Sequence, residues 1–125
     1  MVARSGAKSV LIVEDDPDIR EVLEEMLDAG GHPVITATNG AEGLEALDRV
    51  PAPAVILLDL MMPVMSGFAF LEELARRTDR QGDRVLLISA NETVERAAQL
   101  PGVVGYVRKP FDLDEVLSLV ERHSL

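Results

Sequence analysis

Short runs of apolar residues divide this chain at regular intervals. Five such runs predict β-strands, at residues 9–13, 33–37, 54–58, 84–89 and 103–107. The run 54–58 is continuously apolar and rich in β-branched residues, which is typical of a strand buried on both faces of a parallel sheet. Because Pro33 lacks a backbone donor, we expect the second strand to lie near an edge of the sheet.

Between the strands, apolar residues recur at the spacing of helices with one buried face. The predicted helices span residues 17–29, 41–49, 68–77 and 92–100, and a last one begins at 111–112. Asp16 followed by Pro17 suits a helix start, and Gly30 suits its end. The expected buried residues are Ile19, Val22, Leu23, Met26 and Leu27 in the first helix and Leu113, Val116, Leu117 and Val120 in the last. Residues 78–83 are expected to form a polar linker.

Strand and helix patterns alternate five times, which indicates an α/β fold whose parallel sheet is covered by helices on both faces. Right-handed crossovers favour a doubly wound, flavodoxin-like three-layer sandwich with strand order 2-1-3-4-5. In that order the carboxyl ends of strands one, three, four and five lie in a row. The polar residues expected there are Glu14 and Asp15, Asp59, Ser89 and Lys109.

Composition narrows the possible functions. The length of 125 residues suits one domain, and we expect an extension at 1–8 and the domain at 9–123. The net charge of −10 disfavours direct nucleic-acid binding. Without cysteine, the chain has no disulfide, thiolate metal site or cysteine nucleophile. It has neither a signal-peptide core nor an apolar run of membrane-spanning length, so we expect a cytoplasmic protein without membrane contact.

Asp59 is the most informative candidate, because an ionised carboxylate at the end of a buried strand is costly to desolvate. Ligands of open α/β sheets bind beyond the carboxyl ends of the strands. Crowding with Glu14 and Asp15 calls for a cation or a lysine, and oxygen ligands without His or Cys favour Mg²⁺. Taken singly, the acidic turn 14–16 is also typical of a helix cap. A single lysine such as Lys109 is usually a solvated surface charge. The residues alone therefore indicate a Mg²⁺-dependent phosphate or carboxylate site.

Four ordered motifs resemble the receiver domains of bacterial two-component response regulators, including chemotaxis regulators. They are LIVEDD at 11–16, LLDLMMP at 57–63 with Gly67, LISA at 87–90 and YVRKPF at 106–111. The resemblance covers about residues 9–121. It departs at Ser66, where the family usually has an acid. At the position of Glu14 aspartate is also frequent, and at the position of Ser89 threonine is commoner. None of these departures removes a ligand or the acceptor.

The resemblance implies a signalling switch in a phosphorelay, with no enzymatic activity beyond its own phosphorylation and slow dephosphorylation. Asp59 would accept a phosphoryl group from a sensor histidine kinase, or exchange it with a histidine phosphotransfer protein. Asp15 and Asp59 would bind Mg²⁺, with the backbone carbonyl of Met61, and Glu14 would act directly or through a water. Lys109 would pair with a phosphoryl oxygen, and its bond to Pro110 is expected to be cis.

Further implied roles concern switching and lifetime. Ser89 would donate its hydroxyl to the phosphoryl group, allowing Tyr106 to turn inward and change a protein-binding surface of the fourth helix, fifth strand and last helix. Alternatively, Tyr106 is a half-buried strand residue without a switching role. Met61 and Asn91 are expected to border the path of the hydrolytic water. A thioether cannot orient that water, so we expect slow self-dephosphorylation.

Two other functions remain as alternatives. A phosphohydrolase of the haloacid dehalogenase type needs a second acid two residues after its nucleophile, where this chain has Met61. A degenerate receiver would serve only as a binding scaffold, although the full set of candidate site residues argues against this. Because no output domain precedes the end at Leu125, we expect a stand-alone receiver or one cut from a larger protein.

Overall fold

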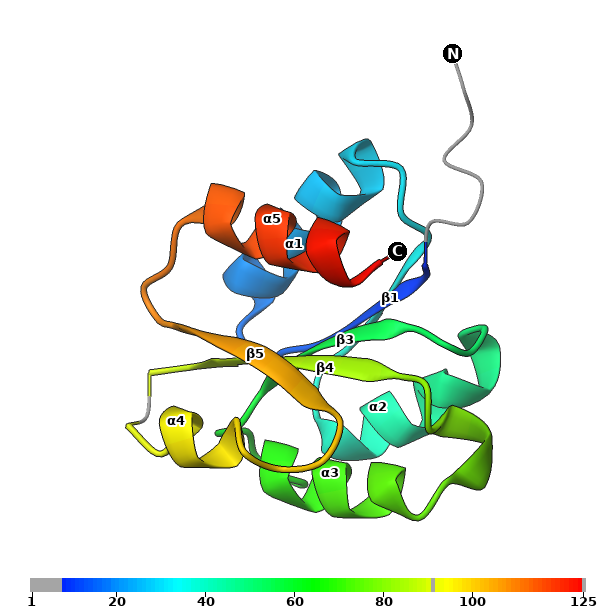
Figure 1. The fold of residues 1–125 in the computed structure, drawn as a ribbon. Helices are drawn as coiled ribbons and strands as arrows, with labels where there is room; N and C mark the ends of the chain where they lie inside the picture. The colour runs from blue at the N-terminus through cyan, green and yellow to red at the C-terminus, as the bar shows by residue number, and fades with distance from the viewer. Residues whose placement is uncertain (1–7, 91, 125) are drawn as a thin grey trace.

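The computed structural model describes residues 8–90 and 92–124 and is built around a five-stranded parallel sheet (Figure 1). The strands are β1 (Val10–Val13), β2 (Val34–Ala37), β3 (Val55–Asp59), β4 (Arg84–Ser89) and β5 (Val103–Arg108). Their order is β2-β1-β3-β4-β5 and all neighbours are parallel, which confirms the predicted topology. β2 lies at an edge, as the proline before it predicted.

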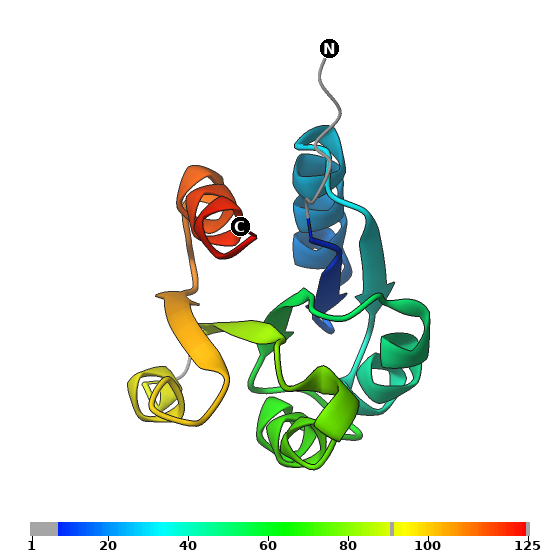
Figure 2. The same ribbon diagram turned by 45° about the vertical axis from the view of Figure 1, so that its right-hand side comes forward.

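Helices cover both faces of the sheet, as Figures 1 and 2 show. One face carries α1 (Pro17–Ala29) and α5 (Leu113–His123), and the other carries α2 (Gly40–Ala46), α3 (Gly67–Ala75) and α4 (Val94–Ala97). Each face has its own apolar core, so the fold is the predicted three-layer sandwich. None of the helices in the described ranges has the length and apolarity needed to cross a bilayer.

Side-chain caps place the helix starts at the carboxyl edge of the sheet. The Asp16 carboxylate accepts hydrogen bonds from the backbone nitrogens of Asp18 (2.9 Å) and Ile19 (3.3 Å), with Pro17 at the first helical position as predicted. Asn39, Ser66 and Asp112 cap α2, α3 and α5 in the same way. The first helix ends at Ala29. The four caps fix where α1, α2, α3 and α5 begin.

Two predicted helices are shorter than expected. The helix predicted over 92–100 is wrong at both ends, because α4 spans only Val94–Ala97. Beyond it the chain continues in tighter turns, with backbone bonds from Gln99 to Arg96 and from Leu100 to Ala97. Similarly, α2 ends at Ala46 and continues as the 3₁₀ helix η1 (Leu47–Arg49).

Two residues assigned to buried helix faces are exposed. Val22 of α1 and Leu113 of α5 are 42% and 37% exposed, because the two helices pack through their other apolar positions. Both residues line a cavity of about 300 Å³ that also borders Phe111 and Lys109. The apolar faces of these helices are therefore wider than the surfaces they bury.

The expected polar linker at 78–83 contains a buried ion pair instead. After the 3₁₀ helix η2 (Thr78–Arg80), the Arg80 guanidinium lies 2.7 Å from the Asp83 carboxylate, and both side chains are almost fully buried. Arg80 also donates to the carbonyl of Val50 (2.6 Å), and Asp83 accepts from the backbone nitrogen of Ala54 (2.8 Å). These bonds join η2 to the connection that leads into β3.

Replacing Arg80 by alanine would leave the Asp83 carboxylate buried without its cation. We expect the free energy of unfolding, measured by urea denaturation, to fall by about 3–5 kcal/mol. Arg77→Ala is the matched control, because Arg77 pairs with Asp48 and Asp79 at the exposed surface; its loss should be at most about 1 kcal/mol. Similar losses in the two variants would contradict the role assigned to the buried pair.

Candidate functional site

The carboxyl ends of four strands meet along one edge of the sheet, in the predicted row. Asp59 is the last residue of β3 and Ser89 the last of β4, while Glu14 and Lys109 directly follow β1 and β5. Asp59 pairs in register with Ile88, and the backbone nitrogen of Lys109 donates to the carbonyl of Ser89 (3.0 Å). Residues far apart in the sequence thus become neighbours at this edge.

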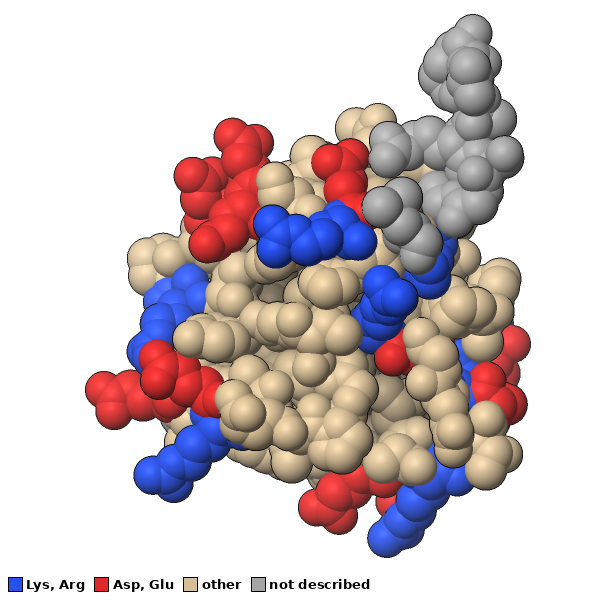
Figure 3. All heavy atoms as spheres, viewed as in Figure 1, with Lys and Arg blue, Asp and Glu red and all other residues tan. Residues whose placement is uncertain are grey.

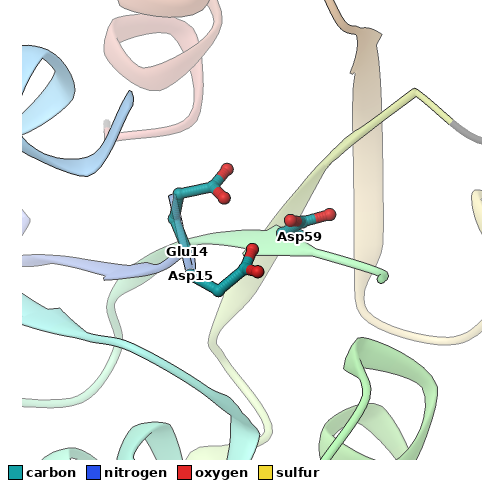
Figure 4. Close-up of side chains that lie close together, drawn as sticks. All are labelled: Glu14, Asp15 and Asp59. Atoms are coloured by element: carbon teal, nitrogen blue, oxygen red, sulfur yellow. The ribbon is translucent and has the colours of Figure 1, made fainter. Parts of the chain in front are cut away.

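Three carboxylates converge here. Glu14, Asp15 and Asp59 each contribute an oxygen, and these atoms all lie within 4.8 Å of one another. Figure 4 shows the Glu14 and Asp15 side chains leaving the end of β1, with the Asp59 carboxylate beside them. Glu14 and Asp59 are buried, whereas Asp15 is exposed. The cluster is therefore half enclosed and open to solvent on the Asp15 side.

Glu14 is fully buried, which changes its acidity. Burial raises the pKa of its carboxyl to about 7, although the Lys109 ammonium and the backbone nitrogen of Asp16 act in the opposite direction. The Asp16 nitrogen donates to Oε2 of Glu14 at 3.0 Å. Oε1 lies 2.8 Å from Nζ of Lys109 but outside hydrogen-bond geometry, and has no hydrogen-bond partner among the described residues.

Asp59 is held from two sides. Its Oδ1 accepts from the backbone nitrogen of Met61 (3.1 Å) and its Oδ2 from Nζ of Lys109 (3.2 Å). Burial raises the pKa of Asp59, and the positive charge of Lys109 opposes this shift. The carboxylate is therefore oriented at both oxygens while remaining next to the other two acids.

Lys109 supplies the cation that the acidic cluster requires. Desolvation lowers the pKa of its ammonium, but the contacts with Glu14 and Asp59 outweigh this, so the pKa is raised. The group stays charged and bridges the two buried acids. The Lys109–Pro110 peptide is cis, as expected; a second cis peptide, Ala52–Pro53, was not anticipated.

The donor set fits Mg²⁺. All the available side-chain ligands are carboxylate oxygens, which a hard cation prefers. The buried Oε1 of Glu14, without a hydrogen-bond partner among the described residues, is an acceptor suited to a cation or to its bound water. Met61 adjoins the cluster, with its side chain 56% exposed.

Close packing beside Asp59 explains Gly67 at the start of α3. A Cβ atom on Gly67 would lie 2.5 Å from the carbonyl oxygen of Asp59 and 2.8 Å from Cα of Leu60. Both are backbone atoms, which cannot move aside easily. The sequence motif includes this glycine, but only the structure shows that α3 begins directly against the peptide of Asp59.

Arg20 is a contact residue that sequence reasoning missed. Its Nη1 donates to the carbonyl of Glu14 at 2.8 Å and lies 3.4 Å from the carbonyl of Asp15. The sequence does show an arginine near the start of the helix that follows Glu14 and Asp15. Nothing in the sequence distinguishes Arg20 from the other charged residues of that helix.

The two proposed switch residues lie on the neighbouring strands β4 and β5. Ser89 is buried at the end of β4, and Tyr106 is 38% exposed on β5, where it pairs in register with Leu87. Asn91 lies outside the described residues. The roles assigned to these residues, and those of Asp59, Lys109 and the metal ligands, stay predictions.

Comparison with known proteins identifies the family. The family described as "Response regulator receiver domain" matches residues 10–121. The chain belongs to this family. It is a receiver domain of two-component response regulators and takes part in phosphorelay signalling. The predicted boundaries at 1–8 and 9–123 stay predictions.

Relatives place similar domains in proteins of very different length. The chain is 41% identical over 115 residues to the DNA-binding transcriptional regulator NtrC of Escherichia coli, an alignment that covers 90% of this chain and 24% of that protein. It is 37% identical to the hybrid signal transduction histidine kinase D of Dictyostelium discoideum, covering 89% of this chain and 7% of the kinase. The chain thus spans only a minor part of these curated relatives.

Among solved structures, the receiver is similar to the chemotaxis response regulator CheY4 of Vibrio cholerae, with a TM-score of 0.83 and 28% identity. That alignment covers 93% of this chain and 98% of CheY4. It is also similar to NtrX of Brucella abortus, with a TM-score of 0.82 and 26% identity over 94% of this chain and 27% of NtrX. These likenesses confirm the predicted fold.

The raised pKa of Glu14 makes the stability of the metal-free protein depend on pH. The carboxyl titrates near 4.5 in the unfolded chain and at about 7 in the folded protein, so the folded state binds this proton more tightly. The resulting stabilisation is complete below the unfolded pKa and is lost as pH rises through the folded pKa. In EDTA, the unfolding free energy of the wild type should therefore fall relative to Glu14→Gln between about pH 5 and about pH 8.

Urea denaturation of both proteins across this range measures the difference. Glu14→Gln is the matched reference, because it keeps the shape of the side chain and cannot titrate. A difference between the two proteins that stays constant with pH would contradict the raised pKa.

Proposed function

We propose that Asp59 is the phosphoryl acceptor of this receiver, and that the donor is a phosphohistidine of a sensor histidine kinase or of a histidine phosphotransfer protein. The observation that carries the proposal is the environment of its carboxylate. Lys109 contacts it at 3.2 Å, and the Glu14 and Asp15 oxygens lie within 4.8 Å of one of its own. A carboxylate with a fixed cation and a cation-binding acid pair beside it is equipped to receive a phosphoryl group.

The transfer step uses the ionised form of Asp59. One carboxylate oxygen forms a bond to phosphorus while the phosphorus–nitrogen bond to the donor imidazole breaks, and its electron pair stays on the ring nitrogen. Burial raises the pKa of Asp59, which disfavours the ionised form, and the positive charge of Lys109 opposes this effect. Lys109 then follows the negative charge from the carboxylate to a phosphoryl oxygen.

Asp15 and Asp59 would hold Mg²⁺ through their side chains, together with the backbone carbonyl of Met61. Glu14 would take part directly or through a bound water. When bound, the ion offsets charge on the transferred phosphoryl group. A divalent ion at this place would favour the ionised form of the Glu14 carboxyl and so oppose the rise in its pKa that burial causes.

Phosphorylation acts on the neighbouring strands. It adds roughly −1.5 to −2 charge and three acceptor oxygens at Asp59. Ser89 donates its hydroxyl to one of them, the chain after β4 follows, and Tyr106 turns inward from its exposed position. The adjacency of Asp59, Ser89 and β5 at one sheet edge supports this coupling.

The response is read by a protein partner at the surface formed by α4, β5 and α5, in the cytoplasm. Figure 3 shows this side of the molecule, with acidic and basic groups around a wide uncharged area. Val104 and Tyr106 of β5 are 40% and 38% exposed, and an ion pair between Glu95 and Arg108 joins α4 to β5. The net charge of −10 favours a protein over nucleic acid as the partner.

Incubation with acetyl phosphate and Mg²⁺ tests the acceptor. Intact mass spectrometry should show the addition of one phosphoryl group to the wild type and none to Asp59→Asn, which lacks the nucleophilic carboxylate. Asp48→Asn, a change at an exposed acid, should be modified like the wild type. Modification of Asp59→Asn would overturn the assignment, and steady turnover of small phosphate esters would favour a phosphohydrolase instead.

Met61 allows a prediction about the lifetime of the phosphorylated form. Asparagine at this exposed position can orient a water by a hydrogen bond, whereas the thioether cannot. We therefore expect Met61→Asn to lose its phosphate roughly five to ten times faster than the wild type, which is the rate change that one hydrogen bond in the transition state corresponds to. Val64→Asn is the control, because Val64 is exposed in the same loop and a polar side chain there should leave the rate unchanged. Phosphate release followed by intact mass after removal of acetyl phosphate measures both; equal rates in Met61→Asn and the wild type would refute the role of Met61.

A further inference from the structure

A guanidinium group from α1 holds the acidic segment that follows β1. Nη1 of Arg20 donates to the carbonyl of Glu14 at 2.8 Å and lies 3.4 Å from the carbonyl of Asp15. These are the backbone groups of two of the three residues in the acidic cluster. The guanidinium therefore contacts the backbone of the acidic segment through these two carbonyls.

The other restraints on this segment act at its two ends. The backbone nitrogen of Glu14 donates to Ala37 on β2 at 3.1 Å, and Asp16 is fixed as the cap of α1. Asp15 lies between them with an exposed side chain. Because Arg20 contacts the carbonyl groups of the two peptide bonds that flank Asp15, it restrains the rotation of these two peptides.

We propose that Arg20 is a positioning residue for the cation site: by holding the carbonyls of Glu14 and Asp15, it aims their carboxylates at the space beside Asp59. This inference rests on the proposed function, in which that space holds Mg²⁺. Mg²⁺ demands near-ideal octahedral geometry at short distances, so a small rotation of a ligand peptide weakens binding. Residues that orient metal ligands typically change metal affinity by about 10- to 100-fold when they are replaced.

Electrostatics alone predicts the opposite sign. A positive charge near three carboxylates repels a second cation, so its removal would strengthen Mg²⁺ binding. If Arg20 instead positions the carboxylates, its removal would weaken Mg²⁺ binding. A purely structural role would lower the unfolding free energy without changing the Mg²⁺ affinity of the folded protein. The direction of the change in affinity therefore separates the three explanations.

The test compares Mg²⁺ dissociation constants, measured by isothermal titration calorimetry, of the wild type and two variants. Arg20→Gln removes the positive charge, and its shorter side chain does not reach the two carbonyls; it should weaken Mg²⁺ binding by about tenfold. Arg20→Lys keeps the charge but has a single ammonium in place of the planar guanidinium, and should also weaken binding. Arg122→Gln makes the same charge change at an exposed position on α5 and should bind Mg²⁺ like the wild type.

Two further measurements complete the test. Circular dichroism and urea denaturation in EDTA establish that each variant is folded, and Arg20→Lys carries the comparison if Arg20→Gln is not. At saturating Mg²⁺, the rate of modification by acetyl phosphate should return close to the wild-type rate, because Asp59 and Lys109 are unchanged. This recovery distinguishes a loss of metal affinity from damage to the acceptor.

Unchanged or tighter Mg²⁺ binding in folded Arg20 variants would overturn the positioning role while leaving Asp59 as the acceptor. A wild type that binds no Mg²⁺ and accepts no phosphoryl group would instead overturn the proposed function itself. The two failures are therefore separate results of the same experiment.

Discussion

Two buried carboxylates share one lysine at the carboxyl edge of the sheet, and the acceptor chemistry proposed for this receiver depends on that arrangement. Burial raises the pKa of both Glu14 and Asp59, and the ammonium of Lys109, at 2.8 and 3.2 Å, offsets part of this cost. A single lysine does not neutralise two buried acids and an exposed third. The remaining negative charge suits the cluster to the divalent cation proposed for it.

A second buried ion pair in the fold differs from this cluster in its balance of charge. The Arg80–Asp83 pair is as deeply buried, but its charges balance and its atoms bond to the backbone of the connection that leads into β3. The groups of that pair bond to one another and to neighbouring backbone groups. At the carboxyl edge, by contrast, a buried oxygen of Glu14 has no hydrogen-bond partner among the described residues. This oxygen has only the ammonium of Lys109 beside it, at 2.8 Å.

The same domain serves proteins of different organisation. It accounts for nearly all of CheY4 but for about a quarter of NtrC and a small part of the hybrid kinase. This is possible because every group of the proposed acceptor site comes from strand ends within one sheet.

Much of this molecule follows from the sequence, because burial on both faces of a sheet requires continuous apolar strands, and those strands are visible in the chain. Their alternation with helices favoured the strand order 2-1-3-4-5, which predicts the row of Glu14, Asp59, Ser89 and Lys109 and which the structure confirms. Other features depend on distances that no local pattern records. The burial of Arg80 requires a carbonyl 30 residues away, the length of α4 depends on which backbone carbonyls its last turn bonds, and the reach of Arg20 to the acidic segment depends on how α1 leaves β1. Only the tertiary structure decided these, because each depends on where separate segments of the chain come to rest against one another.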